Sequence, residues 1–526
     1  MRDTVSAPDT QPERTVMTDR TLQGLDQDLD ADVIVVGSGN AALCAGIAAL
    51  EGGADVLMIE KAPEALRGGN SAYTAGAMRF VYDGRDDLLP LLSDPDDERL
   101  ERTEFGAYTA RTFERDLLSF NGGRPLSVEQ RALIDGSYAT MRWLAGHGVT
   151  FEPIWSRQSF ERDGRIVFWG GLTLASENEG VGLVEREIAA FRRMGGRIRY
   201  ETPARDLIVE NGRVVGVETD DGPLRARAVV LAAGGFEASA EARDAWMGGP
   251  WEAAKVRGTP HNTGDGLRMA LDVGAARHGY YSGAHATPMD LHMKDYGNLD
   301  LPAGERKNYR KICYFLGIML NAEGKRFVDE GQNFRNYTYA QFGRAILDQP
   351  GGFAWQLFDA KVLNLLYAEY NHHDAHYVEA DTLDELIGRL EGVDRDGARA
   401  TIEAFNAAVD DAVPFDPTAL DGKSAKDVSP PRSNWAQALD TPPFRGYPVT
   451  GGITFTYGGL KVDEAGRALR EDETAIEGLH VCGEMVGGVF FEGYPGGSGL
   501  TSGAVFGRRA GTGAAASAGR LQEAAE

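Results

Sequence analysis

The stretch ADVIVVGSGNAALCAGIAALEGGADVLMIEK, residues 31–61, carries the strongest structural signal in the chain. Its first six residues are mostly apolar and β-branched, which is typical of a short buried parallel strand. Two glycines follow, then a helical run, and then a second apolar strand that ends at Glu60. Gly37 allows a tight turn, Gly39 lets a pyrophosphate approach the helix N-terminus, and Ala42 lets helix and strand pack. The stretch therefore predicts a dinucleotide-binding unit.

The acid at the end of the second strand supports this interpretation. Glu60 follows Gly37 by 23 residues, close to the ~20 typical of the acid that binds a ribose hydroxyl. Strands in residues 225–236 and 478–488 also run into glycines, and Glu484 is a candidate for binding a ribityl hydroxyl. Three such segments favour one large flavin cofactor over a nicotinamide.

Composition excludes several classes of protein. The 526 residues include 54 Lys and Arg against 79 Asp and Glu, a net charge of −25, which argues against nucleic-acid binding. Three cysteines, Cys44, Cys313 and Cys482, exclude a disulfide framework and a four-cysteine metal site. The length predicts two or three domains or one large discontinuous unit.

Neither a membrane span nor a signal peptide is predicted. No apolar run approaches the ~18 residues of a membrane-spanning helix. Residues 1–30 are polar, with scattered charge and no apolar core, and we expect a disordered arm there. The sequence therefore favours a soluble, cytoplasmic protein.

The order of these motifs resembles the flavoprotein superfamily of fumarate reductase and succinate dehydrogenase. The glycine fingerprint and the acid are followed by Gly68-Gly69-Asn70-Ser71, and the resemblance spans roughly residues 30–515. The branch containing tricarballylate dehydrogenase and 3-ketosteroid dehydrogenase is the most similar. The strings closest to the tricarballylate enzymes are GKRFVDEGQNFRNYTYAQFGR (324–344), TFTYGGL (454–460) and YPGGSGLTSGAVFGR (494–508).

The resemblance implies an α/β fold in which a Rossmann-like FAD-binding domain of the glutathione-reductase type is interrupted by an α+β capping domain. We assign residues 31–283 and 455–526 to the FAD-binding domain and residues 284–454 to the cap. Asn211-Gly212 predicts a hairpin turn. Periodic apolar residues predict helices in 381–390 and 397–412 of the cap, and a last helix in 503–520.

FAD is expected to be bound noncovalently. Family members with covalent flavin carry a histidine in the loop equivalent to residues 70–76, and no histidine is present there. The expected cofactor-binding residues are Gly37, Gly39, Asn40, Ala41, Ala42, Glu60, Lys61, Gly68, Gly69, Asn70, Ser71, Ala204, Ala233, Gly234, Gly235, Asp265, Gly483, Glu484, Ser498, Gly499 and Leu500.

Three residues are candidates for the chemistry, which requires a proton-transfer group opposite the flavin. Arg335 lies near the position of the proton-donating arginine of fumarate reductases, and it either transfers the proton or clamps a carboxylate. His285 matches the first substrate-binding histidine of the family. Tyr494 stands where fumarate reductase has an arginine, and in ketosteroid dehydrogenases this tyrosine polarises a carbonyl.

Further residues are expected to bind substrate. Arg79 and Arg310 are candidate carboxylate clamps, and Arg310 belongs to the basic run Arg306, Lys307, Arg310 and Lys311. Alternatively, this run is a solvated basic face or a contact for an acidic partner. The other expected contacts are Phe455, which replaces the family's second substrate histidine, Thr456 and Gly497. We predict no metal site, although His372, His373, Asp374 and His376 cluster in one short loop.

The resemblance implies dehydrogenation or reduction of a C–C bond beside a carboxylate or carbonyl, with hydride passing to flavin N5. A tricarballylate-like polycarboxylate is the leading substrate, and an external electron acceptor, such as a membrane electron carrier, would reoxidise the flavin. One alternative is a desaturase or ene-reductase acting on a ketone or a natural-product intermediate. Another is an electron-transfer flavoprotein subunit, which would bind FAD without being reduced by any small acid.

Overall fold

The computed structural model describes residues 29–307 and 309–519. Most of the expected N-terminal arm, residues 1–28, lies outside this range. The nucleotide-binding part is built on a six-stranded sheet in the order β20-β21-β13-β1-β2-β9, in which only β20 is antiparallel to its neighbour. These strands are β1 (Val33–Val36), β2 (Val56–Ile59), β9 (Arg197–Arg199), β13 (Ala228–Leu231), β20 (Arg467–Leu469) and β21 (Ala475–Val481).

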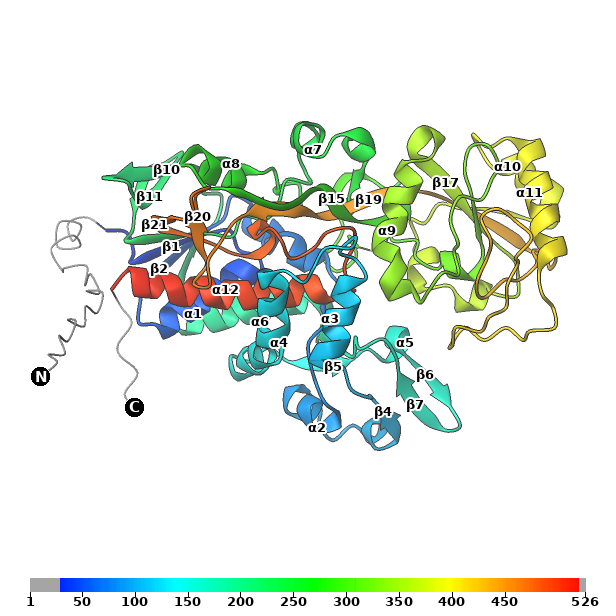
Figure 1. Cartoon of the computed structure of the whole chain (residues 1–526), viewed down its shortest axis with the longest axis horizontal. Helices are drawn as coiled ribbons and strands as arrows, with labels where there is room; N and C mark the ends of the chain where they lie inside the picture. Colours follow the sequence, from blue (N-terminus) through cyan, green and yellow to red (C-terminus); the bar gives the residue numbers. More distant parts are fainter. Residues whose placement is uncertain (1–28, 308, 520–526) are drawn as a thin grey trace, which may run out of the picture.

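Helices from opposite ends of the chain pack together beside this sheet. α1 (Asn40–Glu51) and α12 (Ser498–Ser517) lie side by side, with α6 (Glu179–Arg193) next to them (Figure 1). Glycines spaced four residues apart on α12 allow this contact: a Cβ at Gly507 would lie 2.4 Å from the Ala41 carbonyl oxygen, and one at Gly511 would lie 2.1 Å from that of Ala45. The predicted last helix is confirmed, and it begins five residues earlier than expected.

The predicted hairpin is confirmed. Strands β10 (Ala204–Glu210) and β11 (Arg213–Thr219) pair antiparallel, and β12 (Gly222–Arg225) extends them to a three-stranded sheet. Asn211 and Gly212 both have positive φ, 52° and 80°, as expected for a type I′ turn.

A small lobe, formed by the chain between β2 and β9, projects from the nucleotide-binding part. It lies below the main body in Figure 1. Its elements are β3 (Ala77–Met78), α2 (Arg85–Leu88), β4 (Thr103–Glu104), α3 (Ala110–Leu118), α4 (Val128–Gly146), β5 (Phe151–Pro153), α5 (Trp155–Gln158), β6 (Ser159–Arg162), β7 (Arg165–Phe168) and β8 (Leu174–Ser176).

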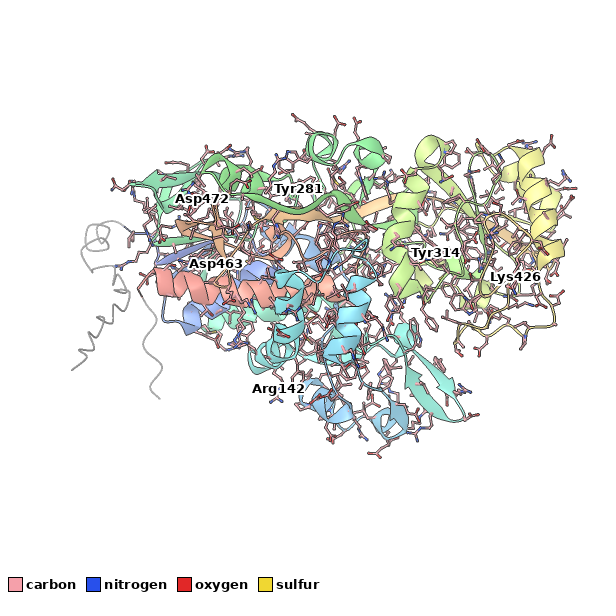
Figure 2. The ribbon with its side chains drawn as sticks, in the orientation of Figure 1. Arg142, Tyr281, Tyr314, Lys426, Asp463 and Asp472 are labelled. Carbon is pink, nitrogen blue, oxygen red and sulfur yellow. The ribbon has the colours of Figure 1, made fainter. Side chains whose placement is uncertain are left out.

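The cap is joined to the nucleotide-binding part by two long antiparallel strands, β15 (Arg277–Asp290) and β19 (Phe444–Leu460). Figure 1 shows them running from one part into the other, so the expected boundaries at 283/284 and 454/455 fall within continuous strands. The cap has its own apolar cores, and Tyr314, labelled in Figure 2, is buried in one of them against α9. The other elements of the cap are β16 (Ile318–Leu320), α9 (Arg335–Leu347), β17 (Phe353–Phe358), β18 (Val378–Ala380), α10 (Leu383–Arg389) and α11 (Arg395–Ala408). Before β15 the chain forms α7 (Ala240–Trp246), β14 (Lys255–Val256) and α8 (Asp265–Asp272), and α8 packs against β10 of the nucleotide-binding part.

The two predicted cap helices correspond to α10 and α11. Across residues 29–519, position 308 aside, no helix is both long and apolar enough to span a membrane.

Candidate functional site

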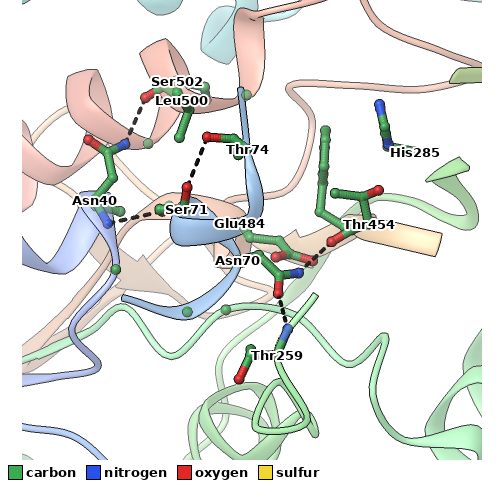
Figure 3. A pocket seen from close by; sticks show the side chains of 18 of the residues that line it. Asn40, Asn70, Ser71, Thr74, Thr259, His285, Thr454, Glu484, Leu500 and Ser502 are labelled. Carbon is green, nitrogen blue, oxygen red and sulfur yellow. Dashed lines mark hydrogen bonds between the residues drawn. The ribbon is translucent and has the colours of Figure 1, made fainter. Parts of the chain in front are cut away.

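A cavity of about 630 Å³ lies at the carboxyl ends of the parallel strands, where nucleotide-binding sheet, lobe and cap meet. This edge of a parallel sheet is where α/β proteins bind their ligands. The cavity runs from the turn after β1 to aromatic and cationic side chains of the cap. Figure 3 shows Asn40 and His285 on opposite sides of Asn70 and Glu484.

The N-terminus of α1 lies at one end of the cavity. Gly37 has φ +111°, and a Cβ there would lie 2.4 Å from the Ala232 carbonyl oxygen, so the turn requires glycine. A Cβ at Gly39 would come no closer than 3.5 Å to any other part of the protein. No protein contact demands glycine at that position, and its missing side chain instead leaves the helix terminus open to an anion. The Asn40 side chain donates to the Leu500 carbonyl oxygen at 2.9 Å, which ties α1 to α12 (Figure 3).

Acidic groups line the adjoining part of the cavity. Glu60 is buried and accepts hydrogen bonds from the Ser38 hydroxyl at 2.7 Å and the Ala62 backbone N–H at 2.8 Å. A carboxylate has about four lone-pair positions, so Glu60 retains acceptor capacity for a ribose hydroxyl. Lys61 and Asp265 form an ion pair of 2.5 Å beside it.

A polar network fills the centre of the cavity wall. Glu484 accepts from the Thr456 backbone N–H at 2.6 Å and from its hydroxyl at 2.9 Å. Behind it, Glu237 is fully buried and accepts from Asn70 and Asn262 at 2.5 and 2.6 Å. Burial, reinforced by repulsion from Glu484, raises the pKa of Glu237 well above its usual range. Burial therefore favours the protonated form of Glu237, and its hydrogen bonds orient Asn70 and Asn262, which line the cavity.

These features fit FAD. The open N-terminus of α1 suits the pyrophosphate, Glu60 suits a ribose, and Glu484 with Asn70 offers polar groups to the ribityl chain and flavin. His261 also lines the cavity, and its buried Nε2 has no protein partner, as expected of an atom that a ligand would contact.

Aromatic rings build the far end of the cavity. His285 on β15 stacks on Phe455 with ring centroids 5.2 Å apart. Tyr339 and Tyr494 meet His285 edge-on, at 5.1 and 4.9 Å. The two tyrosine hydroxyls are hydrogen-bonded at 2.5 Å. Burial, followed by the positive charges of Arg257 and Arg310, lowers the pKa of His285 well below its usual range, so His285 is neutral at pH 7.

Arginines gather beside this aromatic wall. Arg157, Arg257, Arg310 and Arg335 all line the cavity. Glu369 pairs with Arg310 at 2.5 Å and with Arg157 at 3.4 Å. Burial alone would raise the pKa of Glu369, but Arg310 and Arg157 lower it to about 2.

Much of the positive charge at this end is not neutralised. Burial and repulsion from Arg310 lower the pKa of Arg257 to about 9, so Arg257 remains cationic at neutral pH. The Nε atoms of Arg257, Arg310 and Arg335 are buried and have no protein partner. Buried donors without partners favour an anionic ligand.

Most of the residues expected at the site line this cavity. They include the candidates for chemistry, Arg335, His285 and Tyr494, and the substrate contacts Arg310, Phe455, Thr456 and Gly497. The expected cofactor residues that line it are Gly37, Gly39, Asn40, Ala41, Glu60, Lys61, Gly69, Asn70, Ser71, Ala204, Ala233, Gly234, Asp265, Gly483, Glu484, Gly499 and Leu500.

Other expected residues lie just behind the wall. Ala42 and Ser498 are fully buried in α1 and α12. A Cβ at Gly235 would lie 1.9 Å from Glu484 Oε1, so this glycine makes room for the glutamate. Gly68 has φ +93° and its N–H donates to Ser38 Oγ at 3.2 Å.

The structure does not place Arg79 in the cavity wall, contrary to its expected role as a carboxylate clamp. Its guanidinium donates to the carbonyl oxygens of Gly496 at 2.7 Å and Gly170 at 2.6 Å, and its side chain is fully buried beneath Tyr108. Arg79 therefore connects the lobe to the turn before α12.

The four residues of the basic run have different surroundings. Within its described part, Arg310 alone lines the cavity. Arg306 donates to the carbonyls of Leu301 and Leu299. Lys307 pairs with Glu179, and Lys311 lies 3.7 Å from Asp290.

Sequence reasoning missed several residues of the site. Arg157 and Glu369 come from the lobe and from a short turn of the cap, and no motif marked either one. The sequence could have indicated Tyr339, because this residue lies one helical turn after Arg335 and therefore on the same helix face. Glu237 follows the Gly234-Gly235 pair, where an acid at the end of a strand is a recognisable feature.

The histidine-rich loop brings some potential ligand atoms together. Glu305, His372 and His373 place ligand atoms within 4.8 Å of one another. His372 Nδ1 faces the backbone N–H of Asp374 at 3.4 Å. Glu305 Oε2 lies 3.8 Å from His372 Nε2, so an acid–imidazole contact accounts for the proximity of these side chains.

The comparisons with known proteins show that the chain is similar to FAD-binding proteins. The family described as "FAD binding domain" matches residues 32–500. The 3-oxosteroid 1-dehydrogenase of Mycobacterium tuberculosis is 27% identical over 88% of this chain and 94% of its own length. The 4-oxocyclohexanecarboxylate 2-dehydrogenase of Sinomonas cyclohexanicum is 28% identical over 88% and 89%. NADH:acrylate oxidoreductase of Vibrio harveyi is 24% identical over 91% of this chain, which spans only 50% of that protein.

Solved structures share the fold. A flavocytochrome c3 fumarate reductase in an open conformation has a TM-score of 0.69 at 23% identity, covering 95% of this chain and 80% of its own. The 3-ketosteroid delta1-dehydrogenase from Sterolibacterium denitrificans has a TM-score of 0.70 at 22% identity, covering 93% and 99%. The expected α/β flavoprotein fold is confirmed.

Proposed function

The chain belongs to the FAD binding domain family, and on that basis we propose that it is an FAD-dependent oxidoreductase that dehydrogenates or reduces a C–C bond beside a carboxylate. Bound FAD would supply the hydride chemistry. The relatives act on acrylate, on 3-oxosteroids and on 4-oxocyclohexanecarboxylate, as their names state. All of these compounds carry a carboxylate or a carbonyl.

The arginine cluster is the observation that carries the proposal. Four guanidinium groups line one end of the cavity, and the only carboxylate paired with them in the described part of the chain is Glu369. Guanidinium donors bind carboxylates with directional, charge-assisted hydrogen bonds. Arg310 and Arg257 would orient the acid, and the aromatic wall at His285 and Phe455 would exclude water from the reacting bond.

Arg335 fits a clamp better than a proton donor. Its NH2 group donates to the Arg157 carbonyl oxygen at 3.3 Å, and its buried Nε has no protein partner, so it can donate to a bound carboxylate. A guanidinium keeps its proton across the ordinary pH range and is therefore a poor acid. We therefore assign Arg335 to binding the carboxylate.

A ketone is the second candidate substrate, and the hydrogen-bonded hydroxyls of Tyr339 and Tyr494 favour it. Burial, followed by Tyr339, raises the pKa of Tyr494 well above its usual range, so Tyr494 is a neutral hydrogen-bond donor. When Tyr339 donates to Tyr494, the Tyr494 hydroxyl can donate to a carbonyl oxygen and polarise it. The arginine cluster and the tyrosine pair together would suit an acid that also carries a ketone.

Tricarballylate is the polycarboxylate to test first, because the excess of arginines over Glu369 suits a tri-anion. Such a dehydrogenase needs an external electron acceptor to reoxidise the flavin, and a membrane electron carrier is one candidate. A flavoprotein that serves only in electron transfer would not need the arginine cluster.

An anaerobic absorbance titration tests the proposal. The purified yellow protein is titrated with tricarballylate and with a cyclic keto acid, and loss of the flavin bands identifies the electron donor. The reductase direction is tested by reducing the flavin with dithionite and adding the unsaturated acid. FAD that dithionite reduces, but that no acid or ketone reduces or reoxidises, would contradict the proposal.

A further inference from the structure

A second cavity adjoins the first on the outer side of the arginine cluster. Its volume is about 250 Å³, which is enough for one or two fused rings, and it lies between the lobe and the cap. Ser156, Arg157 and Arg335 line both cavities. The two arginines therefore form a partition between the two cavities. The first cavity, in which the proposed reaction takes place, is called the reaction cavity below.

The walls of the second cavity are aromatic. Trp169 stacks on Phe334 with ring centroids 4.6 Å apart and an interplanar angle of 23°. Phe334 contacts Trp435 at 5.8 Å, and Trp435 contacts Phe315 at 5.5 Å. These rings come from the end of β7 and from three separate cap segments. Aromatic walls favour a planar apolar ligand through burial and ring–ring contacts.

The partition offers cationic donors to the same space. Arg335 is 8% exposed, and its NH2 group donates to the Arg157 carbonyl oxygen at 3.3 Å, while its buried Nε has no protein partner. Its guanidinium also lies over the Tyr367 ring, 5.2 Å from the centroid. Arg157 shares Glu369 with Arg310, which is closer to the carboxylate. The partition is therefore short of negative charge.

We propose that the second cavity binds an aromatic carboxylate, with its ring against Trp169 and Phe334 and its carboxylate on Arg157 and Arg335. Such a ligand satisfies the unpartnered guanidinium donors and covers the aromatic walls at the same time. The arginines are shared with the reaction cavity, so an aromatic acid held here competes with a substrate carboxylate that uses the same donors. This competition rests on the proposed function, whereas the binding itself does not.

Isothermal titration of the FAD-loaded protein with 2-naphthoate tests the binding. We expect one site per chain and at least tenfold weaker binding of 2-naphthalenemethanol, which has the ring but no charge. Trp169→Leu should weaken naphthoate binding about tenfold, and Trp143→Leu, a tryptophan on α4 outside both cavities, should leave it unchanged. Arg157→Gln should abolish the preference for naphthoate over the alcohol.

Several outcomes would overturn the proposal. They are no binding of naphthoate to fully FAD-loaded protein, equal binding by Trp169→Leu, or equal discrimination by Arg157→Gln. If Trp169→Leu does not fold with FAD bound, Phe160→Leu, at another wall of the second cavity, replaces it with the same expected loss. Binding is measured without turnover, so a protein whose flavin no acid reduces would still give a result.

Discussion

The hydroxyl oxygens of Tyr339 and Tyr494 lie 2.5 Å apart, although the residues are separated by 155 positions in the sequence. Tyr339 belongs to helix α9 of the cap, and Tyr494 belongs to the turn before α12 of the nucleotide-binding part. The bond therefore joins the two parts of the molecule at the wall of the reaction cavity. It also fixes the direction in which the Tyr494 hydroxyl points.

Tyr339→Phe should lower kcat about tenfold on a ketone substrate and change KM less. Tyr494 keeps its own hydroxyl but loses the partner that orients it, and loss of a single hydrogen-bond donor at a reacting oxygen costs at most about 10²–10³-fold. Steady-state kinetics with separate kcat and KM checks this. Tyr337→Phe is the matched control, because Tyr337 lies on the same helix and its hydroxyl contacts Asp116 outside the cavity. Equal losses in both variants would mean a general effect on α9.

Arg310→Gln should raise the KM for an acid substrate by about tenfold to a hundredfold, because one buried charge-assisted contact is lost. It also removes the shorter of the two ion pairs of Glu369, and breaking a buried pair costs about 3–5 kcal/mol. Kinetics, FAD content and thermal unfolding are measured together. Arg344→Gln on α9 is the control, since that arginine is partly exposed and pairs with Asp348. An unchanged KM in Arg310→Gln would remove Arg310 from the substrate site.

His480 should make the protein less stable as the pH falls below about 6.5. Burial lowers its pKa to about 4, while in the unfolded chain it keeps the ordinary value of about 6.5. Between these values the unfolded state binds a proton that the folded state excludes, so the free energy of unfolding falls with decreasing pH, by at most about 1.4 kcal/mol per unit.

Urea unfolding between pH 7.5 and pH 4.5 measures this slope. The buried ring contacts the Ala465 carbonyl oxygen at 3.2 Å and Ser517 Oγ at 3.0 Å. His480→Gln should be less stable at pH 7.5 and show a shallower dependence on pH, whereas the exposed His373→Gln should match the parent. A slope in His480→Gln identical to that of the parent would assign the acid sensitivity to other groups.

Acid precipitation should release the FAD into the supernatant. The loop of residues 70–76 overlaps the short helix Gly69–Tyr73. It has no histidine that could attach the flavin. The absorbance spectrum of the supernatant and the fluorescence of the denatured protein band are compared. Flavin fluorescence that stays with the denatured band would show a covalent link.

Some features could be predicted from the sequence because the residues that define them are neighbours in the chain. The strand, turn, helix and acid of residues 31–61 form one continuous unit, and each step depends on local geometry, such as the positive φ of Gly37. The same holds for the hairpin turn at Asn211-Gly212. Those local rules fixed the class of cofactor site before any tertiary contact was known.

The residues that line the far end of the cavity could not be predicted in the same way, because they come together only through tertiary structure. Arg79 and Arg310 looked equivalent as charges, but only Arg310 lines the cavity, whereas the carbonyl groups of Gly496 and Gly170 bind the Arg79 side chain. Arg157 and Tyr339 reach the site from the lobe and the cap. The direction of a long side chain is set by the packing of distant segments, which the pattern of neighbouring residues does not encode. The sequence by itself determined the strand, turn, helix and acid of the predicted dinucleotide-binding unit, and the packing of lobe and cap against the sheet decided which cations and hydroxyls line the cavity.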